Sequence, residues 1–229
     1  RHPDNLTLAL GTGATTPLQL ASAYGVLANG GYLLPPVLVR KISTTQGEVL
    51  FEAALTAPEE TQRVTSERNA FLTSTLLQEV TRSGTAARAQ ATLKRPDLYG
   101  KTGTTNEVVD AWFAGFQPDR AAVVWIGYDS PRSLGGHQSG ASLALPAWID
   151  YMATALKGVP VRELTAPEGV LRIDGTWRYS EWALGGAIAS LGLDGQVIGP
   201  ALIPQAPATT AAPGPDGAAV SVPGTPSAG

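Results

Sequence analysis

Apolar residues recur along the chain with two periods, one helical and one extended. The first helix is predicted from Thr16, because threonine is a favoured N-cap and Pro17 suits the first helical position, where its missing N–H costs nothing. Residues 29–31, an Asn-Gly-Gly run, end it. This pattern predicts a core helix with a glycine stop.

Two further helices are predicted by apolar residues spaced three and four apart. One opens at Thr65 or Ser66, carries Glu67 in its first turn and ends at 83–85, while the other spans roughly 145–156. The stripes expected to be buried are Phe71, Leu72, Leu76, Leu77 and Val80 on one helix, and Trp148, Ile149, Met152 and Leu156 on the other. Residues 88–94 mix charged, polar and small side chains, which predicts a surface connection.

Extended apolar runs bounded by turn residues predict strands. The predicted strands are 37–44, 48–53, 110–116 and 121–128. The first two flank Gln46-Gly47 and form a hairpin. Residues 121–126 are apolar throughout, which predicts a central strand buried on both faces.

Residues 99–105, Tyr-Gly-Lys-Thr-Gly-Thr-Thr, combine a cation, hydroxyl groups and glycine in one predicted strand. A glycine inside a strand indicates that a ligand or another backbone comes close, here at Gly103. Lys101 carries a fixed positive charge, and Thr102 and Thr104 add hydrogen-bond donors. Together these groups can bind a carboxylate and the peptide that leads to it.

Composition narrows the chemistry. The net charge of -3 is too small to indicate a nucleic-acid partner. The absence of cysteine excludes disulfides, thiolate nucleophiles and cysteine-ligated zinc. The two histidines, His2 and His137, lie far apart in sequence, which disfavours a metal site or a Ser-His-Asp triad. We therefore expect no metal and no cofactor, and a general base that is lysine or a carboxylate, which points to Lys101.

The chain divides into three parts by pattern. Residues 1–157 hold the strong periodicities, and residues 158–203 hold weaker strand-like pieces with Trp177 and Trp182, which predicts a small appendage. Residues 204–229 are mostly Ala, Pro, Gly, Thr and Ser, and are expected to be disordered. Because the chain opens on Arg1, and no run of about 18 apolar residues is present, we expect a piece of a longer protein whose anchor lies upstream.

Three blocks, taken together, resemble the transpeptidase domain of class A, bifunctional penicillin-binding proteins. They are Leu8–Gly11 with Thr16–Tyr24 and Leu27–Gly31; Ser83–Ala86; and Lys101–Asn106 with Asp110–Phe113 and Trp125–Asp129. The resemblance covers roughly residues 6–152. It implies an α+β fold in which helices flank an antiparallel five-stranded sheet, as in serine β-lactamases and D,D-transpeptidases, here incomplete at its N-terminus.

The resemblance also implies a reaction. The family cross-links peptidoglycan through a serine acyl-enzyme formed on a D-Ala-D-Ala stem peptide, and β-lactams mimic that peptide. By resemblance, Lys101 helps proton transfer, Thr102 and Thr104 bind the substrate carboxylate, and the Thr104 N–H contributes to the oxyanion hole. Gly103 and Thr105 are expected at the substrate. Stem peptides and β-lactams are therefore the expected partners.

The serine nucleophile is not found in this chain. No serine has a lysine three positions later, and none has an asparagine two positions later. We expect the Ser-x-x-Lys and Ser-x-Asn motifs, a glycosyltransferase domain and a membrane anchor to lie upstream, in an inner-membrane protein facing the periplasm, with possible cell-wall synthesis partners. The chain alone is expected to be inactive, because donors without a nucleophile form no acyl intermediate.

Two alternative functions stay open on sequence alone. A class A β-lactamase-like hydrolase also carries Lys-Thr-Gly, and a non-catalytic module of the same fold would lack the upstream motifs. Other residues near the stretch are expected to be structural: Trp112 in the core, Asp110 orienting a neighbour, and Ser83 and Thr85 capping a helix.

Overall fold

The computed structural model describes residues 5–11, 13–54, 58–59 and 62–183. Residues 1–185 form one compact unit, and residues 186–229, with the predicted disordered tail, lie outside the described part. The helices are α1 (Pro17–Ala28), α2 (Glu67–Arg82), α3 (Ala87–Leu93) and α4 (Leu145–Ala155). The strands are β1 (Lys41–Ser43), β2 (Val49–Glu52), β3 (Tyr99–Thr104), β4 (Ala111–Gln117), β5 (Arg120–Ile126), β6 (Val170–Ile173) and β7 (Thr176–Tyr179).

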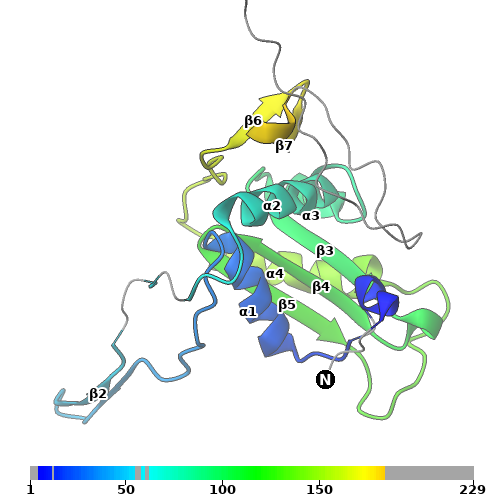
Figure 1. Cartoon of the computed structure of the whole chain (residues 1–229). Coiled ribbons are helices and arrows are strands. Elements are labelled where there is room, and N and C mark those ends of the chain that lie inside the picture. Colours follow the sequence, from blue (N-terminus) through cyan, green and yellow to red (C-terminus); the bar gives the residue numbers. More distant parts are fainter. Residues whose placement is uncertain (1–4, 12, 55–57, 60–61, 184–229) are drawn as a thin grey trace, which may run out of the picture. The chain divides into compact units, whose positions relative to one another are not determined.

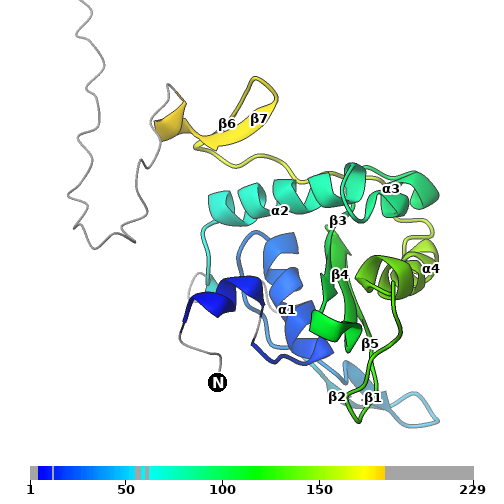
Figure 2. The ribbon, with the colours of Figure 1, turned by 90° about the vertical axis from the view of Figure 1, so that its right-hand side faces the viewer.

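The central feature is an antiparallel sheet with the order β3-β4-β5. Helices α1 and α4 lie on opposite sides of this sheet, and α2 runs across one end of it (Figures 1 and 2). In the register of the first pair, Lys101 lies opposite Ala114 and Gly103 opposite Trp112. The predicted α+β class and helix-flanked antiparallel sheet are confirmed, with three strands of that sheet in the described residues.

Among the described strands of this sheet, the central one is β4, not the predicted run 121–126. β4 pairs with a strand on each side, and its Phe113 and Phe116 are fully buried. β5 is an edge of the sheet in the described part of the chain, and most of its residues are only half-buried. Its apolar character reflects the cover given by helices, since an apolar run does not report how many strand neighbours it has.

Helix α1 begins as predicted. The Thr16 hydroxyl accepts the Gln19 amide at 3.2 Å and the Gln19 side chain accepts the Thr16 amide at 3.0 Å, which completes a capping box before Pro17. Asn29 ends the helix, and Gly30 adopts φ 81°, a left-handed conformation suited to glycine.

Two predictions about the second helical region are wrong. Residues 88–94 are not a surface connection, because residues 88–93 belong to helix α3, whose Ala89 is fully buried, and Lys94 is the C-cap of that helix. Alanine is the strongest helix former, and the small side chains let α3 pack closely. Leu76 of the predicted buried stripe on α2 is 71% exposed.

The core lies between the sheet and α4. Phe113 and Trp148 pack edge to face with ring centroids 4.9 Å apart, and the Trp148 indole N–H donates to the Ala122 carbonyl at 3.1 Å. The fully or nearly fully buried members of this cluster are Ala86, Ala89, Leu98, Phe113, Ala144, Leu145, Trp148, Ile149, Met152 and Leu156. The stripe predicted for the third helix is confirmed.

After α4, the chain returns to the sheet as a segment that we call the strap, residues 159–165. The strap is held by Asp97, which is fully buried just before β3. Asp97 accepts two bonds from Arg95, at 2.9 and 2.7 Å, and one from the Arg162 amide at 2.9 Å. Arg95 also donates to the carbonyl of Val159 at 2.7 Å. Hydrogen bonds that Asp97 accepts and Arg95 donates therefore connect the start of β3 to the strap.

The hairpin β6–β7 follows the strap and contacts α2. Trp177 packs edge to face on Phe71 with centroids 5.0 Å apart, and Arg68 pairs with Glu181 at 3.0 Å. The Tyr179 hydroxyl donates to the Asn69 side chain at 3.0 Å. The described part of the predicted appendage is thus a hairpin seated on α2. The other predicted hairpin, β1–β2, turns at Gly47 with φ 90° and is exposed along both strands.

Candidate active site

Strand β3 changes character along its length. Tyr99 and Gly100 are buried, whereas Lys101 and Thr104 are exposed and Thr102 and Gly103 are half-buried. Within the described residues β3 pairs only with β4, so its other edge offers backbone donors and acceptors to an incoming peptide. The structure therefore brings the predicted site residues Lys101 to Thr104 to an open strand edge.

The cation and the first hydroxyl lie next to each other. Lys101 Nζ donates to the Thr102 carbonyl at 3.0 Å and lies 3.5 Å from Thr102 Oγ1. Thr102 Oγ1 is also 3.0 Å from Oγ1 of Thr85. Thr85 is in the turn between α2 and α3, and the prediction that it caps a helix is wrong because its side chain reaches Thr102 instead. Ser83 does stand at the C-terminal end of α2.

The hydroxyl of Thr104 is held by a different part of the chain, the segment that leads into helix α4. Thr104 Oγ1 accepts the backbone N–H of Gly140 at 3.0 Å. A Cβ at Gly140 would collide with the carbonyl of Trp112 and would lie 2.6 Å from the carbonyl of Gly103. The close backbone approach expected at Gly103 is therefore present, and the approaching backbone is that of Gly140.

Thr105 organises the turn that follows β3. Its Oγ1 accepts the amides of Val109 and Asp110, at 3.1 and 2.8 Å. Val108 has φ 55°, a left-handed conformation that is strained for a β-branched residue. Its carbonyl accepts the Leu134 amide at 2.8 Å, which ties this turn to the loop before α4.

Asp110 orients a neighbour, as expected, because its Oδ1 accepts the Trp125 indole N–H at 2.8 Å. Trp112 is not in the core: it is half-buried and packs against Trp125 with ring centroids 6.0 Å apart. The two tryptophans lie opposite each other in the β4–β5 register, and Trp112 also lies opposite Gly103 of β3.

Two titratable groups at the start of β3, Asp97 and Tyr99, have pKa values shifted from their usual range. Burial raises the pKa of Tyr99 to about 12. Burial also favours the neutral form of Asp97, but hydrogen bonds from Arg95 and the Arg162 amide outweigh it, so the pKa of Asp97 lies below its usual value. Both groups bind the strap, since the Tyr99 hydroxyl accepts the Leu164 amide at 3.0 Å.

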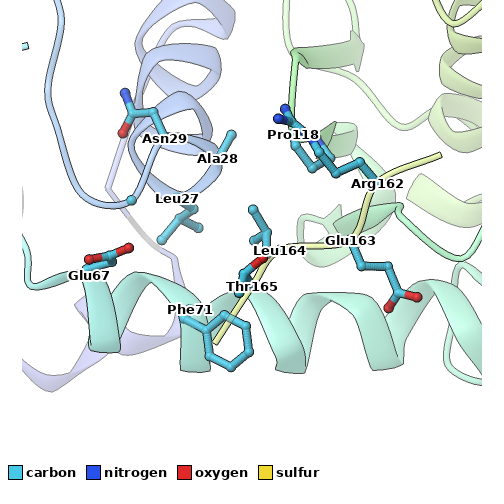
Figure 3. Close-up of a pocket in the computed structure, with 11 residues that line it drawn as sticks. Leu27, Ala28, Asn29, Glu67, Phe71, Pro118, Arg162, Glu163, Leu164 and Thr165 are labelled. Atoms are coloured by element: carbon cyan, nitrogen blue, oxygen red, sulfur yellow. The ribbon is translucent and has the colours of Figure 1, made fainter. Parts of the chain in front are cut away.

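A pocket of about 400 Å³ lies away from these hydroxyls, between the end of α1, the first turns of α2 and the strap (Figure 3). Leu27, Phe71 and Leu164 line its apolar part, and Glu67 and Arg162 stand on its wall. No residue of the Lys101–Thr105 stretch lines it. The pocket therefore belongs to the junction of the strap with the helices.

The described residues contain neither a metal-binding cluster nor a membrane-spanning helix. No group of three or more His, Cys, Asp or Glu side chains is arranged to hold a metal ion. No described helix combines the length and the apolar character that crossing a membrane requires.

Sequence reasoning missed two groups that touch the predicted site. Thr85 was assigned to a cap, although the Ser-Gly-Thr-Ala block that contains it was one of the signals of family resemblance. Gly140 lies in a Gly/Ser-rich stretch that carries no periodicity, and only the fold brings its amide to Thr104.

Comparison with known proteins agrees with this architecture. The family described as "Penicillin binding protein transpeptidase domain" matches residues 4–144. The chain is 43% identical over 180 residues to penicillin-binding protein 1A of Neisseria lactamica, covering 78% of this chain and 22% of that protein. It is 36% identical over 220 residues to penicillin-binding protein 1A of Pseudomonas aeruginosa, covering 75% and 27%. The chain thus spans about a quarter of the length of these relatives.

Solved structures give the same result. Penicillin-binding protein 1A from Haemophilus influenzae superposes with a TM-score of 0.68 at 33% identity, over 76% of this chain and 31% of that one. Penicillin-binding protein PonA1 from Mycobacterium tuberculosis superposes with a TM-score of 0.62 at 30% identity, over 72% and 44%. Because the family match spans more than half of the sequence, this chain belongs to the penicillin-binding protein transpeptidase domain family.

Proposed function

We propose that this chain forms the Lys-Thr-Gly side of a peptidoglycan D,D-transpeptidase and binds the carboxylate end of a D-Ala-D-Ala stem peptide. The observation that carries the proposal is the exposed half of β3, where a cation and two hydroxyls lie on an open strand edge. An extended peptide can pair with such an edge while its terminal carboxylate meets Thr102 and Thr104.

Each residue has a defined part in the proposed reaction. Lys101 assists proton transfer when a serine attacks the peptide carbonyl, and its charge stabilises negative charge in the cleft. The Thr104 amide donates to the oxyanion, and Gly103 lies next to it at the substrate, on the strand segment that the Gly140 backbone supports. Thr105, whose hydroxyl holds the following turn, keeps its predicted place at the substrate.

The nucleophile is proposed to come from a part of the protein outside this chain. The curated relatives are about four times as long as the matched region, which leaves room for Ser-x-x-Lys and Ser-x-Asn motifs, a glycosyltransferase domain and a membrane anchor. The same reasoning supports an inner-membrane protein whose transpeptidase domain faces the periplasm. Possible cell-wall synthesis partners belong to this proposal as well.

Penicillins are the natural probes for the proposed reaction. The PonA1 relative has a structure in complex with penicillin V, and this chain is 28% identical to it with a TM-score of 0.55. We propose that β-lactams acylate the longer protein by mimicking the D-Ala-D-Ala end. The chain by itself binds them without a covalent step, because it lacks the serine nucleophile.

Intact-mass measurement after incubation with benzylpenicillin tests the proposal on two samples. The full-length protein should gain one penicilloyl group that is released slowly, and this chain alone should gain none. Rapid turnover of the penicillin by the full-length protein would favour a hydrolase, and no adduct at all would favour a non-catalytic module. An adduct on the chain alone would place a nucleophile here and overturn the assignment of the serine.

A further inference from the structure

Thr85 lies outside β3, yet its hydroxyl contacts the first hydroxyl of the proposed substrate site. The separation between Thr85 Oγ1 and Thr102 Oγ1 is 3.0 Å, across 17 residues of chain. Among the described residues, no other hydrogen bond involves the Thr85 hydroxyl, and the residue is exposed. The hydroxyl of Thr85 therefore makes its hydrogen bond with strand β3.

The turn that carries Thr85 is fixed on both sides. Ala86 is fully buried in the core, and its amide donates to the Val80 carbonyl at 3.1 Å. Gly84 packs so closely against α2 that a Cβ there would lie 2.9 Å from Val80 Cα. Thr85 thus sits on a rigid support, which is what a positioning group requires.

The donors and acceptors around Thr102 limit the directions in which its hydroxyl proton can point. Lys101 Nζ, 3.5 Å from Thr102 Oγ1, is a donor only and accepts nothing. The Thr102 proton therefore points either to Thr85 or outward into the open edge. If Thr85 donates to Thr102, the outward direction is the one left.

We propose that Thr85 is a positioning residue that donates to Thr102, so that the Thr102 proton is presented to the carboxylate of the stem peptide or β-lactam. This inference rests on the proposed function. A carboxylate only accepts hydrogen bonds, so it needs a hydroxyl already turned toward it. The chain from Thr85 through Thr102 to the anion also strengthens each of its bonds.

The inference makes a prediction that depends on ligand charge. A ligand with a free carboxylate gains from the oriented Thr102 proton, whereas the same ligand with a neutral ester in that place gains far less. Loss of the Thr85 hydroxyl should therefore reduce selectivity for the carboxylate. A merely structural role would slow the acylation by both ligands alike.

The test measures acylation rates of the full-length protein by benzylpenicillin and by its methyl ester. Thr85→Val, which keeps the shape and removes the hydroxyl, should slow benzylpenicillin about tenfold, the effect of about one hydrogen bond, and leave the ester rate unchanged. Thr85→Ser should restore the rate. Thr92→Val, an exposed threonine on the neighbouring helix α3, is the matched control and should change neither rate.

The outcomes separate this inference from the proposed function. Equal slowing of both ligands, or no slowing of benzylpenicillin, overturns the positioning role while the proposed function stands. No adduct on the unaltered protein overturns both. Should Thr85→Val lower the thermal midpoint, Thr85→Ala gives the same comparison without a β-branched side chain in the turn.

Discussion

The two halves of β3 differ in burial: its first residues are buried, and those that follow are exposed or half-buried. The first half, which we call the anchor half, consists of Tyr99 and Gly100 and is buried together with Asp97, where ionic and aromatic groups are fully satisfied. The second half, the working half, runs from Lys101 to Thr104 and presents a cation and hydroxyls to solvent. One strand thus separates the residues that hold it in place from the residues proposed to contact the substrate.

The difference shows how a rigid strand can carry an open site. Tyr99 stacks on Phe116 with centroids 4.8 Å apart, and its hydroxyl is bonded to the strap. These contacts fix the backbone a few residues before Lys101. The donors of the proposed site are therefore held in place by groups that lie outside that site.

The largest expected effect is on the anchor half. Asp97→Ala leaves the guanidinium of Arg95, which is 11% exposed, without its carboxylate, and should cost about 3–5 kcal/mol of unfolding free energy. Denaturant unfolding of the full-length protein measures it. Asp119→Ala is the matched control, because its pair with Arg162 is exposed and is expected to contribute at most about 1 kcal/mol. Similar losses for both variants would remove the distinction between anchor and surface pairs.

A substitution in the working half should change the acylation rate and leave the stability nearly unchanged. Lys101→Met removes the charge and keeps much of the length, so acylation by benzylpenicillin should slow about 100-fold, which is about 2.7 kcal/mol of barrier. The unfolding free energy should stay within about 0.5 kcal/mol, since Lys101 is exposed. Lys157→Met, another exposed lysine, is the control. A large loss of stability in Lys101→Met would show that the working half also anchors the strand.

High pH should lower the stability of the fold through ionisation of Tyr99 in the anchor half. The pKa of Tyr99 is raised to about 12, above the unfolded value of about 10, so the neutral phenol stabilises the fold below pH 10. That contribution, about 2–3 kcal/mol, should be lost as the pH rises from about 10 to 12. Tyr99→Phe should flatten this part of the stability profile, whereas Tyr151→Phe, at an exposed position, should leave it as it is. An unchanged profile in Tyr99→Phe would contradict the assignment.

The stability that the Asp97 carboxylate contributes changes with pH in the opposite direction to that of Tyr99. Its pKa is lowered, so its contribution is present above the unfolded value and is lost as the pH falls through the folded one.

The smallest predicted effect concerns the contact that supports the working half from the α4 side. Gly140→Ala places a methyl group against the carbonyls of Trp112 and Gly103 and should cost about 1–3 kcal/mol while slowing acylation. Gly136→Ala, in the loop just before Gly140, has open space around its added Cβ and should change neither quantity. Thermal unfolding and acylation rates of both variants, compared side by side, decide whether Gly140 supports the strand.

Local signals made much of the fold predictable. The Thr16-Pro17 start and the Asn29 stop of α1, and the buried stripe of α4, depend on neighbours within a few residues, and the structure confirms them. Residues 88–94 and 121–126 were misjudged because helix formation by alanine-rich segments and the position of a strand within a sheet depend on packing partners. Composition and pattern do not name those partners.

The candidate site was predictable only in part. Lys101, Thr102 and Thr104 carry a recognisable tripeptide with its flanking hydroxyl, so the sequence alone pointed to them. Thr85 and Gly140 reach the strand only through tertiary structure, since their contacts span 17 and 36 residues of chain. A short stretch of sequence does not contain both members of these contacts, so it cannot predict them.

The bond between Asp97 and the strap has a consequence for how the protein is made. Asp97 accepts the amide of Arg162, which is 65 residues further along the chain. At translation rates of about 5–20 residues per second, roughly 3–13 s pass between the synthesis of these two residues. Throughout that interval the nascent chain holds β3 without its strap. Until Arg162 has been made, the buried carboxylate of Asp97 lacks the backbone donor that the strap supplies.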